Sequence, residues 1–466
     1  MMELLAGAAL SFLTPWASVL ATLAALTVQS NLLDGVCLAT GLFTLLFAMD
    51  YIKHRKREFV ALMTVFLASM LLFLNAQDWL YLYFSWELMG LCSYLLIALR
   101  ETEPARKAAR RALVINRISG VAFLLAIVLI SLETGSFSFG VVPPTAALLL
   151  FIAAMIKSSQ IPFVWLPDAM EAPTPVSALL HSATMVAAGP LLLHRFQEHF
   201  LFLSGFIRGW AMLSIVVASF LALVQHNQKR VLAYSTIATV AFLYTVFSSP
   251  LLPVAFSVHA FLKAAYFILV GTYAAGQGYE LETGLNRKSL SSALSLFLML
   301  SLSGAPLLGM FWFKIGENTA ALTVFLSVLY FTRMYCASFS GGAPPRKGIG
   351  TSLALVMAGL SVLLYPVSVP PLSSTVSILA ATAAGLILFN FKPLAATGNA
   401  LNWLFSRKFP EMEPPEERLE NWGYLVGRAA RHGSQRLNRT FTGPVGRDVG
   451  YIAASLAALA MGVMLC

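Results

Sequence analysis

The chain has 466 residues, of which 58% are hydrophobic and only 11% charged, and its formal net charge is +10. Soluble domains carry roughly 25% charged residues, so this composition excludes an ordinary soluble protein and indicates a protein embedded in a membrane. The surplus positive charge falls in short segments between apolar runs, such as residues 53–57 (KHRKR) and 106–111 (RKAARR). Loop charge of this kind reports membrane orientation and gives no indication of nucleic-acid binding.

Apolar runs recur along the chain, and each is close to the ~20 residues that a helix needs to cross the hydrocarbon core of a bilayer. We therefore expect an all-α, multi-pass membrane protein. About fifteen transmembrane helices are predicted, at residues 4–27, 33–52, 59–76, 80–99, 109–132, 145–165, 175–196, 206–226, 231–247, 253–273, 289–315, 320–334, 352–366, 373–389 and 450–466. Counting helices places both basic segments on one side, which the positive-inside rule makes cytoplasmic together with the N-terminus. Glu3 stands where a signal peptide would need basic residues, so the first helix is expected to be retained.

No cofactor or metal site is predicted. The four cysteines, Cys37, Cys92, Cys336 and Cys466, lie singly in apolar context, without the paired spacing of a metal-binding cluster. We interpret them as small core residues. Because we find no nucleotide-binding motif either, a chain of this kind that moves ions would take its energy from partner subunits.

The helices between the two ends form two groups of five. In each group the fourth helix carries a lysine near a helix-breaking residue: Lys157 precedes Pro162, and Lys314 follows Pro306. Proline frees backbone carbonyls, which membrane proteins tolerate where the backbone lines a cavity, and paired broken helices indicate a transport path between inverted repeats. The predicted organisation is N-terminal helices at 1–57, a first five-helix repeat with a proton half-channel at 58–198, a second five-helix repeat at 199–340, additional transmembrane helices at 341–398, an amphipathic interfacial helix at 399–447 and a C-terminal anchor at 448–466.

The ionisable residues that we single out inside the apolar runs are Glu87, Lys157, His181, His259, Lys263 and Lys314. A charge at the bilayer centre costs about 2.5–3.5 kcal/mol on insertion scales, so such residues are functional candidates by default. His259 and Lys263 are four residues apart and share a helix face. A series of titratable groups across the membrane is what a proton relay requires, and we predict that these six residues form one.

A structural role stays open for each of the six. Glu87 can serve as the counter-ion that a buried lysine needs. Lys157 and Lys314 can extend toward an interface, and Lys263 can hold helices together. Buried histidines such as His181 and His259 are often hydrogen-bonded core residues.

Three further charged residues have local alternatives. Lys229 and Arg230 begin a helix in the segment QKRVLAYST, where a solvated cytoplasmic end explains them at least as well as a role in transport. Asp168 lies between two helices and can cap the next helix instead of titrating.

Four segments carry a resemblance to a known family. They are YFSWELMGLCSYLLIAL, IKSSQIPFVWLPDAMEAPTPVSALLHSATMVAAG, QKRVLAYST and HAFLKAAYFILVG. They resemble the hallmark segments of the antiporter-like, proton-pumping subunits of respiratory complex I, most of all the largest and most distal one. The same fold occurs in Mrp-type antiporters and membrane-bound hydrogenases, and the resemblance covers about residues 34–345.

The resemblance implies a role for each candidate residue. Glu87 and Lys157 would form the coupled acid and lysine of the first half-channel, and the proton would move when their interaction shifts. Lys263 would be the central connecting lysine. Lys314 would exchange protons with the far side, and His181 would belong to the central hydrophilic axis.

This chain departs from the family pattern in several places. Gly120 stands where the largest subunits often carry an aspartate that contacts a neighbouring subunit. Ala255 replaces a common histidine one turn before His259, and Glu317 is displaced from the position directly after Lys314. The predicted axis therefore has fewer titratable groups than is usual in the family.

The C-terminal tract at 399–447 places apolar and basic residues at helical spacing, which predicts an amphipathic helix at the membrane interface. The family's distal subunit has a lateral helix here, followed by a final membrane helix like the one predicted at 448–466. The lateral helix is predicted either to contact one partner subunit or to lie on lipid.

We predict a prokaryotic inner-membrane subunit that conducts protons within a larger complex and has no catalytic centre of its own. Its partners would be other membrane subunits of a respiratory, hydrogenase or antiporter complex, together with lipid. A redox partner of the complex I or hydrogenase type is the leading alternative for the energy source. A Mrp-type cation/proton antiporter, with sodium as a further ion, a subunit of an inorganic carbon uptake complex and a non-pumping scaffold also remain open. Four costly intramembrane charges argue against the scaffold.

Overall fold

The computed structural model describes residues 16–28, 31–274, 279–281, 284–306, 308–314, 320–345, 348–364 and 372–390. The chain divides into two compact units, residues 1–398 and 399–466, and every described residue belongs to the first. The predicted interfacial helix at 399–447, the predicted anchor at 448–466 and the start of the first predicted helix lie outside the described residues.

Helices account for all the regular structure of the described residues, which contain isolated backbone bridges but no strand. The α-helices are α2 (Trp16–Val28), α3 (Leu32–Tyr51), α4 (Lys56–Leu74), α5 (Trp79–Ala98), α6 (Glu103–Thr134), α7 (Pro144–Lys157), α8 (Thr174–Ser182), α9 (Ala188–Arg195), α10 (Ser204–Val224), α11 (Gln228–Thr245), α12 (Leu252–Tyr273), α13 (Leu290–Ser303), α14 (Phe311–Lys314), α15 (Ala320–Ser338), α16 (Ile349–Val362) and α17 (Leu372–Asn390). Three short 3-10 helices join them: η1 (Asp168–Glu171), η2 (Met185–Ala187) and η3 (Gln197–Leu203).

Eight helical segments of the described chain are long and apolar enough to cross a membrane. They are Leu32–Tyr51, Lys56–Leu74, Trp79–Ala98, Glu103–Thr134, Thr174–Arg195, Gln197–Val224, Leu252–Tyr273 and Ala320–Ser338. Three shorter apolar helices, α7, α13 and α16, stand beside them. The prediction of an all-α, multi-pass membrane protein is confirmed.

The basic segment at 106–111 is not a loop, as the sequence suggested, but part of α6. This helix begins at Glu103 because the Thr102 side chain accepts a hydrogen bond from the backbone N–H of Ala105, and Pro104 occupies a first-turn position that needs no donor. The basic side chains of the segment are exposed, while alanines such as Ala108 and Ala109 pack inward. The first third of α6 is thus amphipathic and extends the helix beyond the N-terminal end of the apolar run.

The run at 175–196 was expected to be one helix, and the structure interrupts it between α8 and α9. Pro190 has no N–H to donate to the carbonyl of Val186, so the helical ladder is incomplete here. Thr184 has a non-helical backbone, and its hydroxyl donates to the Leu179 carbonyl at 2.9 Å. The interruption leaves the Val186 carbonyl free for a partner from another helix.

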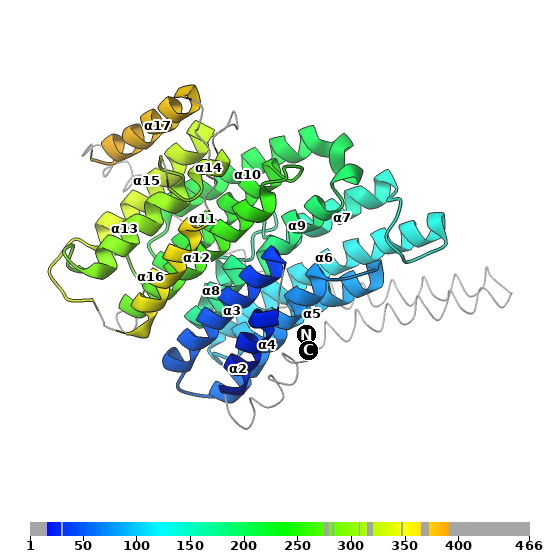
Figure 1. The fold of residues 1–466 in the computed structure, drawn as a ribbon, viewed down its shortest axis with the longest axis horizontal. Helices are drawn as coiled ribbons and strands as arrows, with labels where there is room; N and C mark the ends of the chain where they lie inside the picture. The colour runs from blue at the N-terminus through cyan, green and yellow to red at the C-terminus, as the bar shows by residue number, and fades with distance from the viewer. Residues whose placement is uncertain are drawn as a thin grey trace. The chain divides into compact units, whose positions relative to one another are not determined.

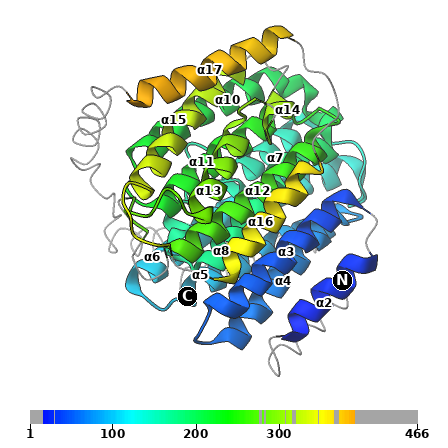
Figure 2. The same ribbon diagram turned by 60° about the vertical axis from the view of Figure 1, so that its left-hand side comes forward.

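The core of the described unit is built around α12. This helix is buried along almost its whole length, as is the segment Thr174–Arg195. Figures 1 and 2 show α3, α8, α11, α13 and α16 gathered about α12, and each of these helices packs against it. Helices at the outside keep apolar side chains exposed, for example Phe84 and Leu125. The most protected positions of the fold therefore lie on α8, α11 and α12.

Candidate functional site

Lys157 is the last residue of α7, and the chain after it leaves the helix for sixteen residues before α8 begins. Ser159 adopts a left-handed backbone with φ +54°, which ends the helix before Pro162 is reached. The Ser159 hydroxyl accepts hydrogen bonds from the N–H groups of Trp165 and Leu166, at 3.0 Å each. The indole of Trp165 donates to the Ile156 carbonyl at 2.9 Å. The break is therefore an ordered polar segment inside the protein.

Lys157 is fully buried, and its ammonium lies against α5. Nζ donates to the carbonyl of Trp86 at 2.6 Å and lies 5.1 Å from the centre of the Trp86 ring, which adds a cation–π contact. Gly90 allows this approach, because a Cβ at that position would stand 3.3 Å from Nζ. No carboxylate of the described residues forms an ion pair with Lys157.

Glu87 follows Trp86 on α5. Its carboxylate forms an ion pair with Arg117 of α6 and not with Lys157. Both side chains are largely buried, with 18% of Glu87 and 29% of Arg117 exposed. Gly120 of α6 makes the space for the carboxylate, because a Cβ there would lie 2.0 Å from Oε1. The glycine that replaces the family's usual acid is thus the residue that lets Glu87 reach Arg117. Glu87 remains within electrostatic range of Lys157.

Helix α11 connects the remaining candidates, since its consecutive residues Ser235, Thr236 and Ile237 each bind a different partner. Ser235 accepts a hydrogen bond from Lys263, Thr236 contacts His181, and the Ile237 carbonyl accepts one from Gln160 at 3.2 Å.

About two turns further along α11, Tyr244 reaches the helix break after Lys157. Its hydroxyl lies 3.1 Å from that of Ser158, which donates to the free Val186 carbonyl at 2.8 Å, so Tyr244 is the donor to Ser158. Gly189 opens this corner, because a Cβ there would stand 2.0 Å from the Tyr244 hydroxyl. Helix α11 therefore holds polar side chains from both predicted five-helix groups.

Each of the two buried histidines has one ring nitrogen that finds no hydrogen-bond partner among the described residues. The Thr236 hydroxyl donates to the Leu232 carbonyl, so His181 Nδ1 is the donor in its 3.1 Å contact with Thr236, and His181 Nε2 carries the lone pair. His259 Nε2 donates to the His181 carbonyl at 3.3 Å, which leaves His259 Nδ1 with a lone pair. Each neutral imidazole can therefore accept a proton without first losing a hydrogen bond.

Lys263 and Lys314 repeat the pattern of Lys157. Lys263 is fully buried and donates to the Leu232 carbonyl at 3.3 Å and to Ser235, with its ammonium 5.7 Å from the Phe331 ring. Lys314 ends the short helix α14 and donates to the carbonyl of Ser303, the last residue of α13, at 2.9 Å. Pro306 lies in the stretch between those helices. Neither lysine pairs with a carboxylate in the part of the chain that the structure describes.

The solvated position considered for Lys229 is wrong, because the side chain is 2% exposed. Its ammonium donates to the carbonyls of Met170 and Ala172, at 2.6 Å each, in the segment that follows the break. Arg230 beside it is exposed. The sequence supported the same interpretation of Lys229 and Arg230, since both lie at the start of α11. Only the fold shows that the Met170 and Ala172 carbonyls lie beside Lys229.

Asp168 does not cap α8, because its carboxylate pairs with Arg111 of α6 at 2.7 Å. Burial raises the pKa of this carboxyl above its usual range, although the arginine opposes the shift. With Lys229, this pair fixes the segment after the break to two helices.

Residues 76–340 match the sequence model of the family described as NADH:quinone oxidoreductase/Mrp antiporter, transmembrane. The chain belongs to this antiporter family. All six candidate residues fall within the matched range.

Members of the antiporter family with curated descriptions are similar to the chain over part of their length. The chloroplastic NAD(P)H-quinone oxidoreductase subunit 5 of Nuphar advena is 33% identical over 354 residues, which cover 65% of this chain and 48% of the relative. The same subunit of Ipomoea purpurea is 34% identical over 355 residues, covering 65% and 50%. The chain thus spans about half the length of the curated relatives it matches.

Two solved structures share the fold. The Mrp complex from Dietzia sp. DQ12-45-1b is matched with a TM-score of 0.70 and 24% identity, over 93% of this chain and 55% of that one. An archaeal respiratory complex, the membrane-bound sulfane sulfur reductase, is matched with a TM-score of 0.70 and 19% identity, over 85% of this chain and 97% of the other.

Proposed function

We propose that this chain conducts protons across the inner membrane of a prokaryote, as one membrane subunit of a multisubunit complex driven by a redox partner. In this proposal the chain has no catalytic centre of its own. The six candidate residues carry the proton, and the partner subunits supply the energy. The two five-helix groups at 58–198 and 199–340 act as inverted repeats, each with one broken helix.

The observation that carries the proposal is shared by Lys157, Lys263 and Lys314. Each lysine is buried, and each ammonium rests on a backbone carbonyl instead of a carboxylate among the described residues. Purely structural buried charges are normally paired, because an unpaired one is costly. A lysine that has only neutral acceptors can lose its proton without leaving an unpaired carboxylate behind. This property suits a group that must be loaded and unloaded.

The contacts of α11 support an order for the steps. A proton from Lys157 would pass the break at Ser158 and Gln160 to α11, and then reach His181 and His259. Both histidines present a lone pair, and His181 lies within electrostatic range of Lys263. Lys263 is in turn within electrostatic range of Lys314. Repulsion between charged neighbours would make the arrival of one proton favour the release of the next.

The Glu87–Arg117 pair supports a defined starting position for this sequence. While Glu87 binds Arg117, Lys157 is left on the Trp86 carbonyl. Movement of the carboxylate from Arg117 toward Lys157 would stabilise the lysine's charge, and its return would promote release. The exchange that the family resemblance implies therefore needs Arg117 as the alternative partner of Glu87.

The test uses the full-length chain reconstituted in liposomes, with a potassium diffusion potential as the driving force and a pH-sensitive dye inside. We expect wild type to conduct protons, and we expect Lys157→Met to lose most of that conductance, because methionine keeps the volume and removes the titratable group. Lys53→Met serves as control, since Lys53 is exposed and its ammonium binds the nearby Asp50 carbonyl. Full conductance in a correctly folded Lys157→Met protein would refute the relay.

A Mrp-type cation/proton antiporter subunit is the second candidate, because the matched family is described by both activities. Purification from native membranes in mild detergent distinguishes the two. Co-purification of dehydrogenase or hydrogenase subunits supports the redox pump, and co-purification of Mrp subunits supports the antiporter. Recovery with one soluble partner would favour proton-driven uptake of inorganic carbon. A chain that conducts neither protons nor sodium would be a scaffold.

A further inference from the structure

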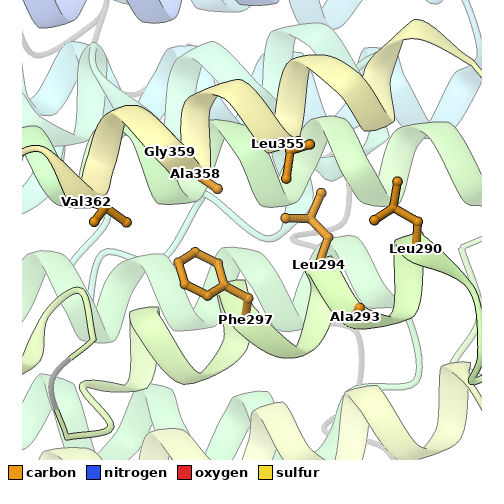
Figure 3. Close-up of a pocket in the computed structure, with 8 residues that line it drawn as sticks. All are labelled: Leu290, Ala293, Leu294, Phe297, Leu355, Ala358, Gly359 and Val362. Atoms are coloured by element: carbon orange, nitrogen blue, oxygen red, sulfur yellow. The ribbon is translucent and has the colours of Figure 1, made fainter.

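A groove of about 330 Å³ opens between α13 and α16 on the apolar outside of the helix bundle. Both helices pack against α12 but barely touch each other, so the furrow between them stays open. Its walls are entirely apolar side chains, as Figure 3 shows. Leu290, Leu294 and Phe297 come from α13, and Leu355, Gly359 and Val362 from α16.

One of the lining residues has no side chain. A Cβ built at Gly359 meets no atom within 4 Å, so nothing in the described protein occupies the space above it. Ala293 and Ala358 flank the same space. Small residues therefore keep a channel clear along the two helices, while Phe297 and Val362 stand at its inner end.

Two basic residues lie in the chain just before Leu290, at the outer end of the groove. Arg287 and Lys288 directly precede α13, whose first residue, Leu290, lines the opening. Both side chains are exposed, and neither forms an ion pair with a carboxylate of the described residues. A hydrogen bond of 2.7 Å from Arg287 Nε to the Phe339 carbonyl fixes the arginine against the loop that leads toward α16.

This end of the groove lies on the same side as the basic segment 53–57. Tyr51, the last residue of α3, shares a 2.7 Å hydrogen bond with Tyr279, and backbone bridges at Leu285 and Asn286 join the loop before α13 to the loop after α15. These contacts collect the loops at one membrane surface. By the positive-inside rule that surface is cytoplasmic, where anionic lipid headgroups attract Lys and Arg side chains.

We propose that this groove binds one anionic phospholipid of the cytoplasmic leaflet. An acyl chain lies in the furrow over Gly359, and the phosphate binds Arg287 and Lys288. The volume favours a lipid over a protein segment, because about 330 Å³ is less than two turns of an α-helix about 10–12 Å wide would occupy. The basic pair at one end and a wholly apolar remainder match the two chemistries of such a lipid.

The test counts lipids retained by the full-length protein in native mass spectrometry, after release from nanodiscs of equimolar phosphatidylcholine and phosphatidylglycerol. We expect wild type to retain one phosphatidylglycerol in preference to phosphatidylcholine. Gly359→Leu fills the groove without a backbone clash and should abolish this retention. Gly209→Leu on α10 is the matched control, because a Cβ there also meets nothing within 4 Å. Lys288→Gln should weaken the preference roughly fivefold, the share expected of one surface charge.

Three results would overturn the proposal. Equal retention in wild type and Gly359→Leu would mean that lipid binds elsewhere. Equal retention of both lipids by wild type would mean that no anionic site exists. A polypeptide that co-purifies with wild type and is lost only in Gly359→Leu would show that a partner helix occupies the groove. If Gly359→Leu fails to fold, an unchanged lipid preference in Lys288→Gln is sufficient to refute the anionic site.

Discussion

Gly120→Ala tests the position of Glu87 with the smallest change the chain offers. The new Cβ would lie 2.0 Å from Glu87 Oε1 and 2.8 Å from Cδ, whereas real Cβ contacts essentially never fall below 3.0 Å. The carboxylate must therefore move by about 1 Å or more, and its bond to Arg117 must lengthen. No charge is removed, and the three atoms nearest to the new methyl group all belong to the Glu87 carboxylate.

The stability cost of this change is expected to be small. Alanine in the middle of a helix is favoured over glycine by roughly 0.5–1 kcal/mol. Lengthening this ion pair without breaking it costs about 1 kcal/mol, less than the ~3–5 kcal/mol for removing one partner of a buried pair. The two terms nearly cancel, so the melting temperature in detergent should change by no more than a few degrees.

The functional effect should be much larger. A change of 1.36 kcal/mol in the interaction between Glu87 and its cations alters proton affinity tenfold. We expect the conductance of Gly120→Ala in the liposome assay to fall several-fold, while Gly209→Ala on α10 conducts as wild type does. Unchanged conductance, in a protein whose fold is intact, would show that the Glu87–Arg117 contact has no part in proton movement.

Three other substitutions test the α11 contacts. Gly189→Ala would bring a Cβ within 2.0 Å of the Tyr244 hydroxyl and 2.7 Å of the Ala154 carbonyl. We expect overpacking to lower the free energy of unfolding by about 1–3 kcal/mol, measured by thermal unfolding. A melting temperature equal to that of wild type would contradict the packing described around Gly189. Gln160→Leu removes two hydrogen bonds, to the Ser158 and Ile237 carbonyls, and should slow proton conductance at nearly constant stability; wild-type conductance would exclude Gln160 from the path. Lys229→Met removes both bonds to the segment after the break, and hydrogen exchange at residues 168–172 should accelerate. Unchanged protection there would mean that the Asp168–Arg111 pair and the contacts of Arg100 with Glu171 hold the segment without Lys229.

Composition and periodicity were sufficient to predict the membrane fold, because a bilayer imposes one length and one polarity on every crossing helix. They were less reliable where a helix end depends on local chemistry. The α6 helix begins six residues before its apolar run, at a Thr–Pro signal that hydropathy ignores. The break between α8 and α9 is accompanied by Pro190 in the first turn of α9, a residue that mean hydropathy over the run does not reveal.

The sequence was sufficient to predict which residues form the candidate site, but not which residues each of them contacts. Lysines and histidines stand out in apolar sequence, so Lys157 and His181 were identified directly. The partner of Glu87 could not be, because Arg117 lies thirty residues away on another helix and the space for their contact is created by Gly120. The burial of Lys229 likewise depends on carbonyls from a segment about sixty residues earlier. Participation of the six residues in proton transfer stays a prediction.

The shared helix α11 has a mechanical consequence. A helix advances by about 100° per residue, so Ile237 and Tyr244, seven residues apart, lie on nearly the same face, and Thr236 lies on another. Any rotation about the helix axis therefore displaces these two faces in different directions at once. Such a rotation would release Gln160 and Ser158 on one side while it disturbs His181 and Lys263 on the other. A rotation of α11 therefore cannot change the contacts of one five-helix group without changing those of the other. Substitutions in the two groups should combine non-additively even where the side chains never meet.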